Sequence, residues 1–195
     1  FRYDGSSLFG PESRWNPYYR VSGAYRISED VSINGIDELK IRAAHGTAGI
    51  RPGFNWQYEV YSLGSGNASA SQAGNRFLKP SQTEETEVGL NVEFLKKFQF
   101  EATYAMSTTT DQFLNVPLVG FLNDGFSRQW QNAGTVKSNT LEFTLGANWY
   151  KKKDLSWNTN FVFSKVRQRI TELPIAPFLA ADQRVNGDQD MFYIK

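Results

Sequence analysis

The stretch Leu141–Lys165, "LEFTLGANWYKKKDLSWNTNFVFSK", contains two alternating runs of apolar and polar residues. Apolar side chains occupy every second position from Leu141 to Trp149, and a similar alternation resumes after the basic turn Lys151–Asp154 and continues to Phe163. A period of two is typical of a β-strand with one apolar face. The stretch therefore predicts a hairpin whose apolar face is covered either by a protein core or by lipid.

The same period of two recurs along most of the chain, and no segment has a convincing amphipathic helical pattern. In each run a set of aromatic or aliphatic residues alternates with polar, charged or small ones. The runs are Tyr19–Ile27, Leu39–Ala44, Phe54–Tyr61, Glu87–Phe94 and Phe98–Met106. The sequence therefore predicts an all-β protein built from antiparallel strands.

The connections between these runs fall into a short and a long class, and following the strands separates the two classes onto opposite ends. The short ones are Ser28–Asp37, Leu95–Lys97 and Lys151–Asp154. The long ones, rich in Gly, Ser, Asn and Pro, are Thr47–Gly53, Ser62–Gln82, Asp111–Asn132 and the tail from Thr171. Short turns at one end and long loops at the other are typical of an up-and-down transmembrane β-barrel.

The polar faces of the runs carry charges in mid-strand, and two interpretations fit them. A soluble antiparallel sheet with one wet face has this pattern, and so does a barrel wall with a hydrated lumen and a lipid-facing outer side. Periodicity alone leaves both interpretations open. The charged residues are Arg20, Arg26, Lys40, Arg42, Glu87, Glu93, Glu101 and Glu142.

The composition excludes or disfavours several classes of function. The 195 residues carry 21 basic and 20 acidic side chains, so a polyelectrolyte surface for nucleic acid is not expected. Cysteine is absent and His45 is the single histidine, which excludes disulfides and thiolate sites and disfavours a histidine metal centre or catalytic triad. No apolar run is long enough for a membrane helix, and no signal peptide is visible. Because the chain starts without Met, we expect the interior of a longer protein.

No residue pattern supports catalysis or a cofactor. There is no nucleophile motif, no metal-ligand spacing and no convincing acid–base pair, so we expect no enzyme, no cofactor and no metal. Asn186, Asp188 and Asp190 alternate as in a calcium loop, but the glycine is misplaced and no closing Glu follows. His45 continues the apolar face of its run and is not expected to bind a ligand.

Several segments, taken in order, resemble the SusC/RagA-type TonB-dependent outer-membrane transporters. They include "RYDGSSLFGPESRWNPYYRVSGAYRISED" (Arg2–Asp30) and "IDELKIRAAHGTAG" (Ile36–Gly49). Further likeness lies in Leu78–Phe113, where an "L-P" element leads to a strand and a tight turn, and in Gln131–Leu173. Each element is weak by itself, whereas the ordered set is fairly specific and covers roughly the first 175 residues.

The resemblance implies that residues 1–195 are part of a barrel of about 22 strands around a plugged lumen. The chain would supply about seven or eight strands, with the plug domain and the C-terminal part of the barrel absent. The implied function is active import of a large nutrient, a glycan (oligosaccharide) or a peptide, across a Gram-negative outer membrane. The long loops would be extracellular and the short turns periplasmic.

The resemblance also implies partners. They are a SusD-like surface lipoprotein over the loops, the TonB complex acting through the missing plug, outer-membrane lipid, the glycan or peptide solute, and a second copy in a homodimer of transporter pairs. No nucleic acid is implied.

The candidate site residues follow from this barrel interpretation. Amphipathic rings beside a short turn fit the membrane interface, while loop aromatics are suited to stack on a solute. The alternative in each case is ordinary packing, and the lumen charges are expected to pair across strands or with the plug. Trp56 and Tyr58 fit either girdle or loop. The interface girdle residues are Trp149 and Trp157, and the substrate candidates are Trp130, Phe121 and Phe126.

Two rival functions remain at this point. A soluble β-rich carbohydrate-binding module predicts that a second sheet of this chain buries Phe143, Leu145, Phe161 and Phe163. A passive outer-membrane porin predicts that no plug domain lies upstream.

Overall fold

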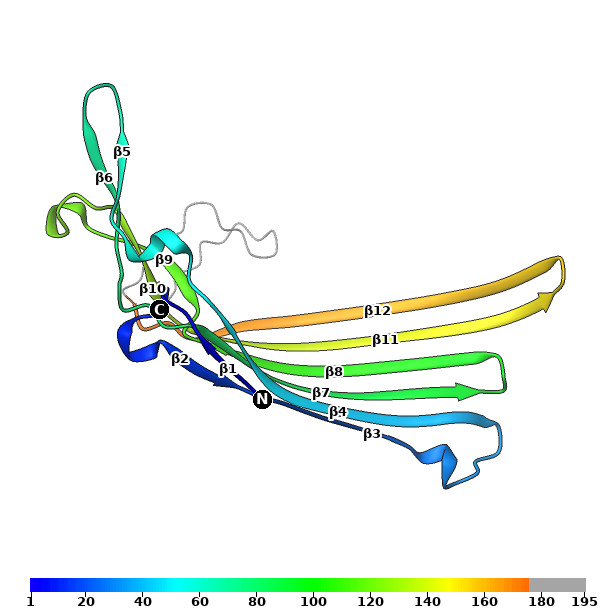
Figure 1. Ribbon diagram of the computed structural model, residues 1–195. Coiled ribbons are helices and arrows are strands. Elements are labelled where there is room, and N and C mark those ends of the chain that lie inside the picture. Colours follow the sequence, from blue (N-terminus) through cyan, green and yellow to red (C-terminus); the bar gives the residue numbers. More distant parts are fainter. Residues whose placement is uncertain (176–195) are drawn as a thin grey trace.

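Six long strands form one antiparallel sheet in a computed structural model that describes residues 1–175 (Figure 1). The spatial order is β12–β11–β8–β7–β4–β3, so each strand pairs with the wall strands next to it in the chain. The bounds are β3 Arg20–Arg26, β4 Ile36–Ile50, β7 Ser81–Phe94, β8 Phe98–Thr110, β11 Thr135–Lys152 and β12 Leu155–Glu172. The predicted all-β, antiparallel up-and-down fold is confirmed, and the described residues contain no α-helix.

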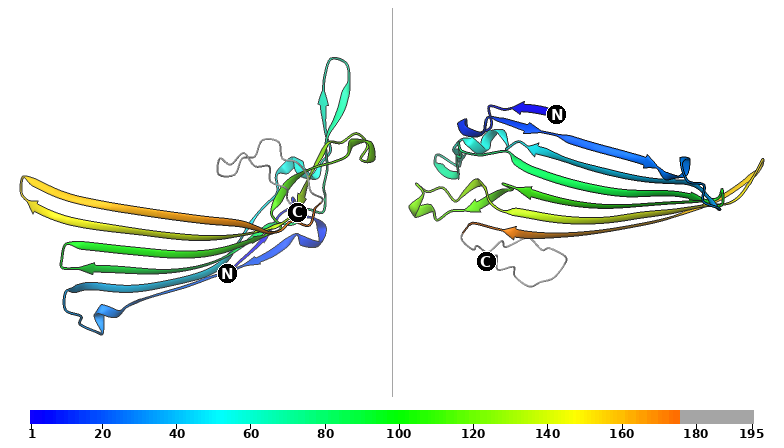
Figure 2. Two further views of the ribbon diagram at one scale, coloured as in Figure 1. Left: turned by 180° about the vertical axis from the view of Figure 1, so that it is seen from behind. Right: turned by 90° about the horizontal axis from the view of Figure 1, so that it is seen from below.

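The connections separate onto the two ends of the sheet, as the loop lengths predict. The turns η2 (Ile27–Glu29) with its following residues, Leu95–Lys97 and Lys153–Asp154 all lie at one end, here named the turn end. The segments 51–80 and 111–134 gather at the opposite end, the loop end, as the views from behind and below show (Figure 2). The three-residue turn Leu95–Lys97 places Leu95 and Lys96 at positive φ, 54° and 56°, and the Lys97 N–H donates to the Phe94 carbonyl at 3.3 Å, as in a type I′ turn.

One predicted strand is wrong. Phe54–Tyr61 was expected to be a strand, whereas Phe54–Gln57 forms the 3-10 helix η3 and β5 (Val60–Leu63) starts later. Pro52 and Gly53 precede η3 and favour a turn. The alternating aromatics there serve loop packing, so the described residues supply six wall strands, fewer than the seven or eight expected. Strand β4 conversely extends to Ile50 through residues expected to be a loop.

The two long connections fold together into a second, four-stranded sheet at the loop end. Its order is β5–β6–β10–β9, and β6 and β10 pair in parallel while the other neighbours are antiparallel. The bounds are β6 Ala68–Ala73, β9 Phe113–Pro117 and β10 Arg128–Asn132, with the short helix η4 at Gly120–Leu122. The β5–β6 hairpin projects away from the long sheet (Figure 1).

A small packed core lies where the N-terminal segment meets the loop end. The hairpin of β1 (Arg2–Gly5) and β2 (Trp15–Tyr18), with the helix η1 (Pro11–Ser13) between them, places Tyr18 against β4. The Tyr18 hydroxyl occupies the space that a Cβ at Gly49 would need. Burial raises the pKa of the Tyr18 hydroxyl, and the Asp4 carboxylate adds to that shift. Leu78 is almost completely buried, and its carbonyl accepts a bond of 2.8 Å from the Gly10 N–H.

The apolar face of the long sheet is not covered by another layer of residues 1–175. Leu145, Phe161 and Phe163 remain 39%, 57% and 37% exposed, and Phe143 is half-buried by its neighbours in the sheet. The soluble-module alternative required these side chains to be buried by a second sheet, and that expectation is wrong. An apolar surface of this extent marks contact with lipid or another protein.

Candidate functional site

The polar face of the long sheet is organised around Arg42 of β4. Its Nη1 donates to Oε1 of Glu87 at 2.6 Å, and its Nη2 donates to Oε1 of Glu101 at 2.8 Å. Thr103 Oγ1 and Asn91 Oδ1 accept further bonds from the same guanidinium, at 2.6 and 3.3 Å. One arginine thus joins β4, β7 and β8, because its planar fork of donors serves several acceptors together.

Gly89 makes this network possible. It lies opposite Arg42 in the β4–β7 register and opposite Thr103 in the β7–β8 register. A Cβ at this glycine would be 2.5 Å from Arg42 Nε and 2.8 Å from Cζ, so any larger residue displaces the guanidinium. The sequence pattern identified the charges but not this role of Gly89, because the register that opposes the two residues is a tertiary property.

A double-mutant cycle measures the Arg42–Glu87 pair. Both side chains are about 30% exposed, so we expect Arg42→Gln with Glu87→Gln to give a coupling of about 1 kcal/mol, below that of a fully buried pair. The measurement is the free energy of unfolding of the full-length protein in lipid. The exposed Arg26–Glu29 pair, at 2.9 Å, is the control and should show no measurable coupling. Equal coupling in both cycles would contradict the assigned role.

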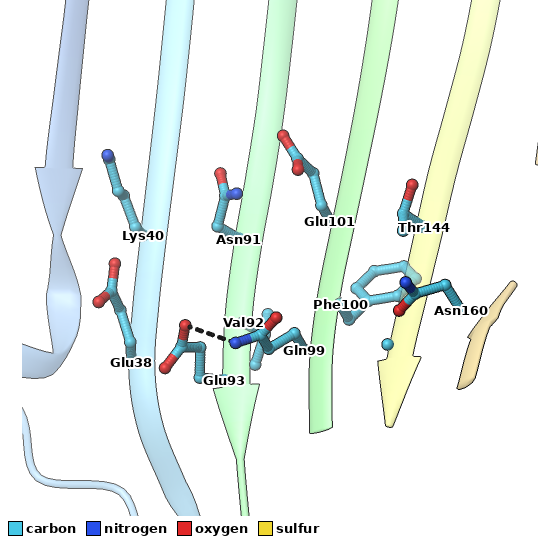
Figure 3. A pocket seen from close by; sticks show the side chains of 11 residues that line it. Glu38, Lys40, Asn91, Val92, Glu93, Gln99, Phe100, Glu101, Thr144 and Asn160 are labelled. Carbon is cyan, nitrogen blue, oxygen red and sulfur yellow. Dashed lines mark hydrogen bonds between the residues drawn. The ribbon is translucent and has the colours of Figure 1, made fainter. Parts of the chain in front are cut away.

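The polar face also holds a shallow depression of about 200 Å³ towards the turn end (Figure 3). Its wall comes from β4, β7, β8, β11 and β12, and Gln99 Nε2 donates to Glu93 Oε1 at 3.4 Å. Three carboxylates and one ammonium give the depression a net negative charge, which favours hydration and ionic contacts. Its charged residues are Glu38, Lys40, Glu93 and Glu101. Within residues 1–175 no group of three or more potential metal ligands gathers, and no helix is long and apolar enough to cross a membrane.

The two tryptophans of the hairpin lie side by side at the turn end. Their ring centroids are 6.5 Å apart, and both side chains are more than half exposed. The β11–β12 register shifts between Asn148 and Tyr150, so Trp149 sits in a β-bulge and Trp157 pairs with Tyr150. Trp149 Nε1 donates to Thr159 Oγ1, and its ring packs edge-on against Phe98. The indoles thus form one aromatic patch at the end of the apolar face.

Trp130, a substrate candidate, is a packing residue of the loop end. Its ring stacks on Trp56 with centroids 3.8 Å apart and planes 12° from parallel, and Phe113 meets Trp56 edge-on at 5.2 Å. Asn75 strengthens the contact, since its N–H donates to the Trp56 carbonyl and its Nδ2 to the Trp130 carbonyl, both at 2.9 Å. Trp56 therefore belongs to the loops rather than to the girdle.

The other two substrate candidates differ sharply in exposure. Phe126 is buried, at 7% exposure, and packs edge-on against Tyr61 of β5. This burial fits the packing alternative, because the ring lies against β5. Phe121 is 95% exposed in η4 and is available to a solute. The Phe126–Tyr61 and Trp130–Trp56 contacts each join one long loop to the other.

Asn132 links the two long loops through hydrogen bonds that the sequence pattern does not predict. Asn132 Nδ2 donates to the carbonyls of Lys79 and Asp111, at 3.0 and 2.9 Å, and its Oδ1 accepts from the Lys79 N–H at 2.8 Å. Asparagine in a loop gives no sequence signal for such a role, because its partners lie about 20 and 50 positions away.

His45 lies on the apolar face near the loop end and takes part in hydrogen bonds. Its Nε2 is 3.0 Å from the Tyr19 hydroxyl and its Nδ1 is 2.9 Å from Thr86 Oγ1. The Asn186, Asp188 and Asp190 spacing lies outside the described residues.

Residues 1–190 match the family model described as TonB dependent receptor-like, beta-barrel. The chain belongs to this family. A six-stranded piece of wall with one apolar and one polar face, short turns and long loops is the geometry that such a barrel requires.

The relatives of this TonB-dependent receptor chain include SusC and RagAB, which confirms the resemblance to SusC/RagA-type transporters. TonB-dependent receptor P39 of Formosa agariphila is 28% identical over 88% of this chain, and SusC of Bacteroides thetaiotaomicron is 25% identical over 100% of this chain. The RagAB peptide importer in its closed-closed state superposes with a TM-score of 0.78 at 25% identity, covering 92% of this chain. The chain spans only 17–21% of the length of these proteins.

The family assigns the two faces of the sheet. In a transmembrane barrel the apolar band faces lipid and the polar side faces the lumen. The Arg42 network and the depression of Figure 3 lie on the polar face of the sheet, and the Trp149–Trp157 patch lies at the end of its apolar face.

Proposed function

We propose that this chain forms part of the barrel wall of an outer-membrane transporter that actively imports a large nutrient, a glycan or a peptide. The observation that carries the proposal is the polar, ion-paired lumen face behind an exposed apolar wall, in a chain whose relatives include SusC and the RagAB peptide importer. No catalytic step is involved. The function of the residues is to line a path and hold its wall in lipid.

The loop end is extracellular in this proposal and the short turns are periplasmic. The long loops receive the solute beneath a SusD-like lipoprotein, and a plug domain in the full-length protein passes the force of the TonB complex to the lumen. Residues 1–195 belong to the barrel domain, and transporter pairs associate as a homodimer. Trp149 and Trp157 mark the periplasmic membrane interface, where indole rings are favoured.

Among the loop aromatics, Phe121 is the residue that we propose contacts the solute directly. It is the most exposed of the three candidates. Trp130 contributes by holding the loops in place, and Phe126 supports the β5–β6 hairpin from within.

Uptake measurements test this function. A strain that lacks the full-length gene should lose growth on one class of nutrient when offered oligosaccharides or peptides as the limiting source. Removal of TonB should abolish the same uptake in the intact strain. Uptake that persists without TonB would contradict the proposal and favour a passive pore.

A further inference from the structure

The lipid-facing side of β11 and β12 changes from apolar to basic as it approaches the loop end. Phe143 pairs with Phe163, and the following pairs on the same face are Leu141–Lys165, Asn139–Arg167 and Lys137–Arg169. The register shifts of this hairpin lie beyond both ends of the set, so the alternation is unbroken there. Four basic residues, here named the basic ladder, thus share the face of the aromatic wall. They are Lys137, Lys165, Arg167 and Arg169.

The position of the basic ladder coincides with the edge of the hydrocarbon layer. The eight residue-to-residue steps from Trp157 to Lys165 span roughly 27 Å of extended strand. With a strand tilt of about 40°, this rise is roughly 20 Å, close to the height of about 25 Å of the apolar band of a barrel. The apolar face therefore runs from the indoles at one interface to Lys165 at the other.

The ladder is not neutralised by carboxylates of the described chain. All four side chains are exposed, and no salt bridge to them is formed within residues 1–175. Glu84 shares their face but lies two strands away from Lys137, across Thr108, and is 3.6 Å from His45 Nε2. Glu142 points to the lumen side, where Ser164 Oγ donates to it at 3.2 Å.

The charge is local and not a belt around the wall. In the register row of the Asn139–Arg167 pair, the neighbouring strands present no Lys, Arg, Asp or Glu; the residues there are Val21, His45, Thr86 and Met106. Three cations on alternate residues of one strand are about 7 Å apart and repel each other. Anions of matching spacing at the headgroup level relieve that repulsion.

We infer that the basic ladder is a binding site for a phosphate-bearing lipid headgroup of the leaflet at the loop end. The arginines bind phosphate oxygens through two donors each, and the lysines act as point charges. The inference rests on the proposed membrane location but not on the nutrient that is transported.

Lipid binding to the full-length, delipidated protein tests the site. The probe is phosphatidic acid doped into neutral detergent micelles, with binding followed by native mass spectrometry. We expect Lys165→Gln with Arg167→Gln and Arg169→Gln to weaken binding by about 100-fold, because each cation near an anionic surface contributes roughly a factor of five. Native-like migration on unboiled gels verifies that the variant folds.

A matched control removes three charges from the other end of the same hairpin. Lys151→Gln with Lys152→Gln and Lys153→Gln should bind phosphatidic acid like the unaltered protein. Equal binding of phosphatidic acid by both triple variants would overturn the inference. Equal binding of inorganic phosphate, offered at the same phosphate concentration, would also overturn it, because that result would indicate a free-anion site. Loss of lipid binding by the ladder variant with intact TonB-dependent uptake supports the inference and leaves the proposed function standing, whereas TonB-independent uptake contradicts only the proposed function.

Discussion

Replacing Phe161 with arginine is expected to destabilise the barrel by about 2–4 kcal/mol, which is the cost of a cation near the bilayer midplane on the lipid face. Phe161 lies about midway between Trp157 and Lys165 and pairs with Leu145. Its ring centroid is 5.9 Å from that of Phe143. Urea unfolding of the full-length protein in vesicles measures the effect, together with the amount of folded protein in the membrane.

The neighbouring position supplies the control. Asn160 precedes Phe161, points to the lumen side and lines the depression of Figure 3. Asn160→Arg adds the same charge on a hydrated face rich in carboxylates, and we expect a change within about 0.5 kcal/mol. Similar destabilisation by both variants would show that the two faces have not been assigned correctly.

Replacing Trp130 with alanine is expected to lower the free energy of local unfolding of the loop end by about 2–3 kcal/mol. The substitution removes the stack on Trp56 and leaves a gap beside Phe113. A fully buried Trp→Ala change costs about 3–5 kcal/mol, and Trp130 is only half-buried. Amide hydrogen exchange in the segments 51–80 and 111–134 should accelerate by roughly 30- to 150-fold, since about 1.4 kcal/mol corresponds to tenfold.

Phe121→Ala separates packing from solute contact. Because Phe121 is almost fully exposed, its removal should leave exchange in both loops unchanged while uptake of the solute declines. Trp130→Ala should impair both. If Trp130→Ala impairs uptake while exchange in the loops stays as in the unaltered protein, Trp130 contacts the solute and is not mainly a packing residue.

Most of the wall strands were predictable from periodicity, because apolar and polar side chains must alternate along a strand that lies between lipid and water. The runs at Leu39–Ala44, Glu87–Phe94, Phe98–Met106 and Leu141–Lys165 all lie in wall strands. Phe54–Tyr61 was misleading because aromatic side chains that pack within a loop can reproduce the same alternation over a few positions. Trp130 and Phe126 were recognised as loop aromatics, but their burial depends on partners in another loop.

The sequence by itself determined the strands, their two faces and the separation of short turns from long loops, since these follow from local alternation and connection length. Only the tertiary structure decided which charges meet, because the Arg42 network depends on a register that places Gly89 between two strands. It also decided that the long loops form one body through Trp56 and Trp130. These contacts join residues far apart in the chain, and no local pattern encodes such distances.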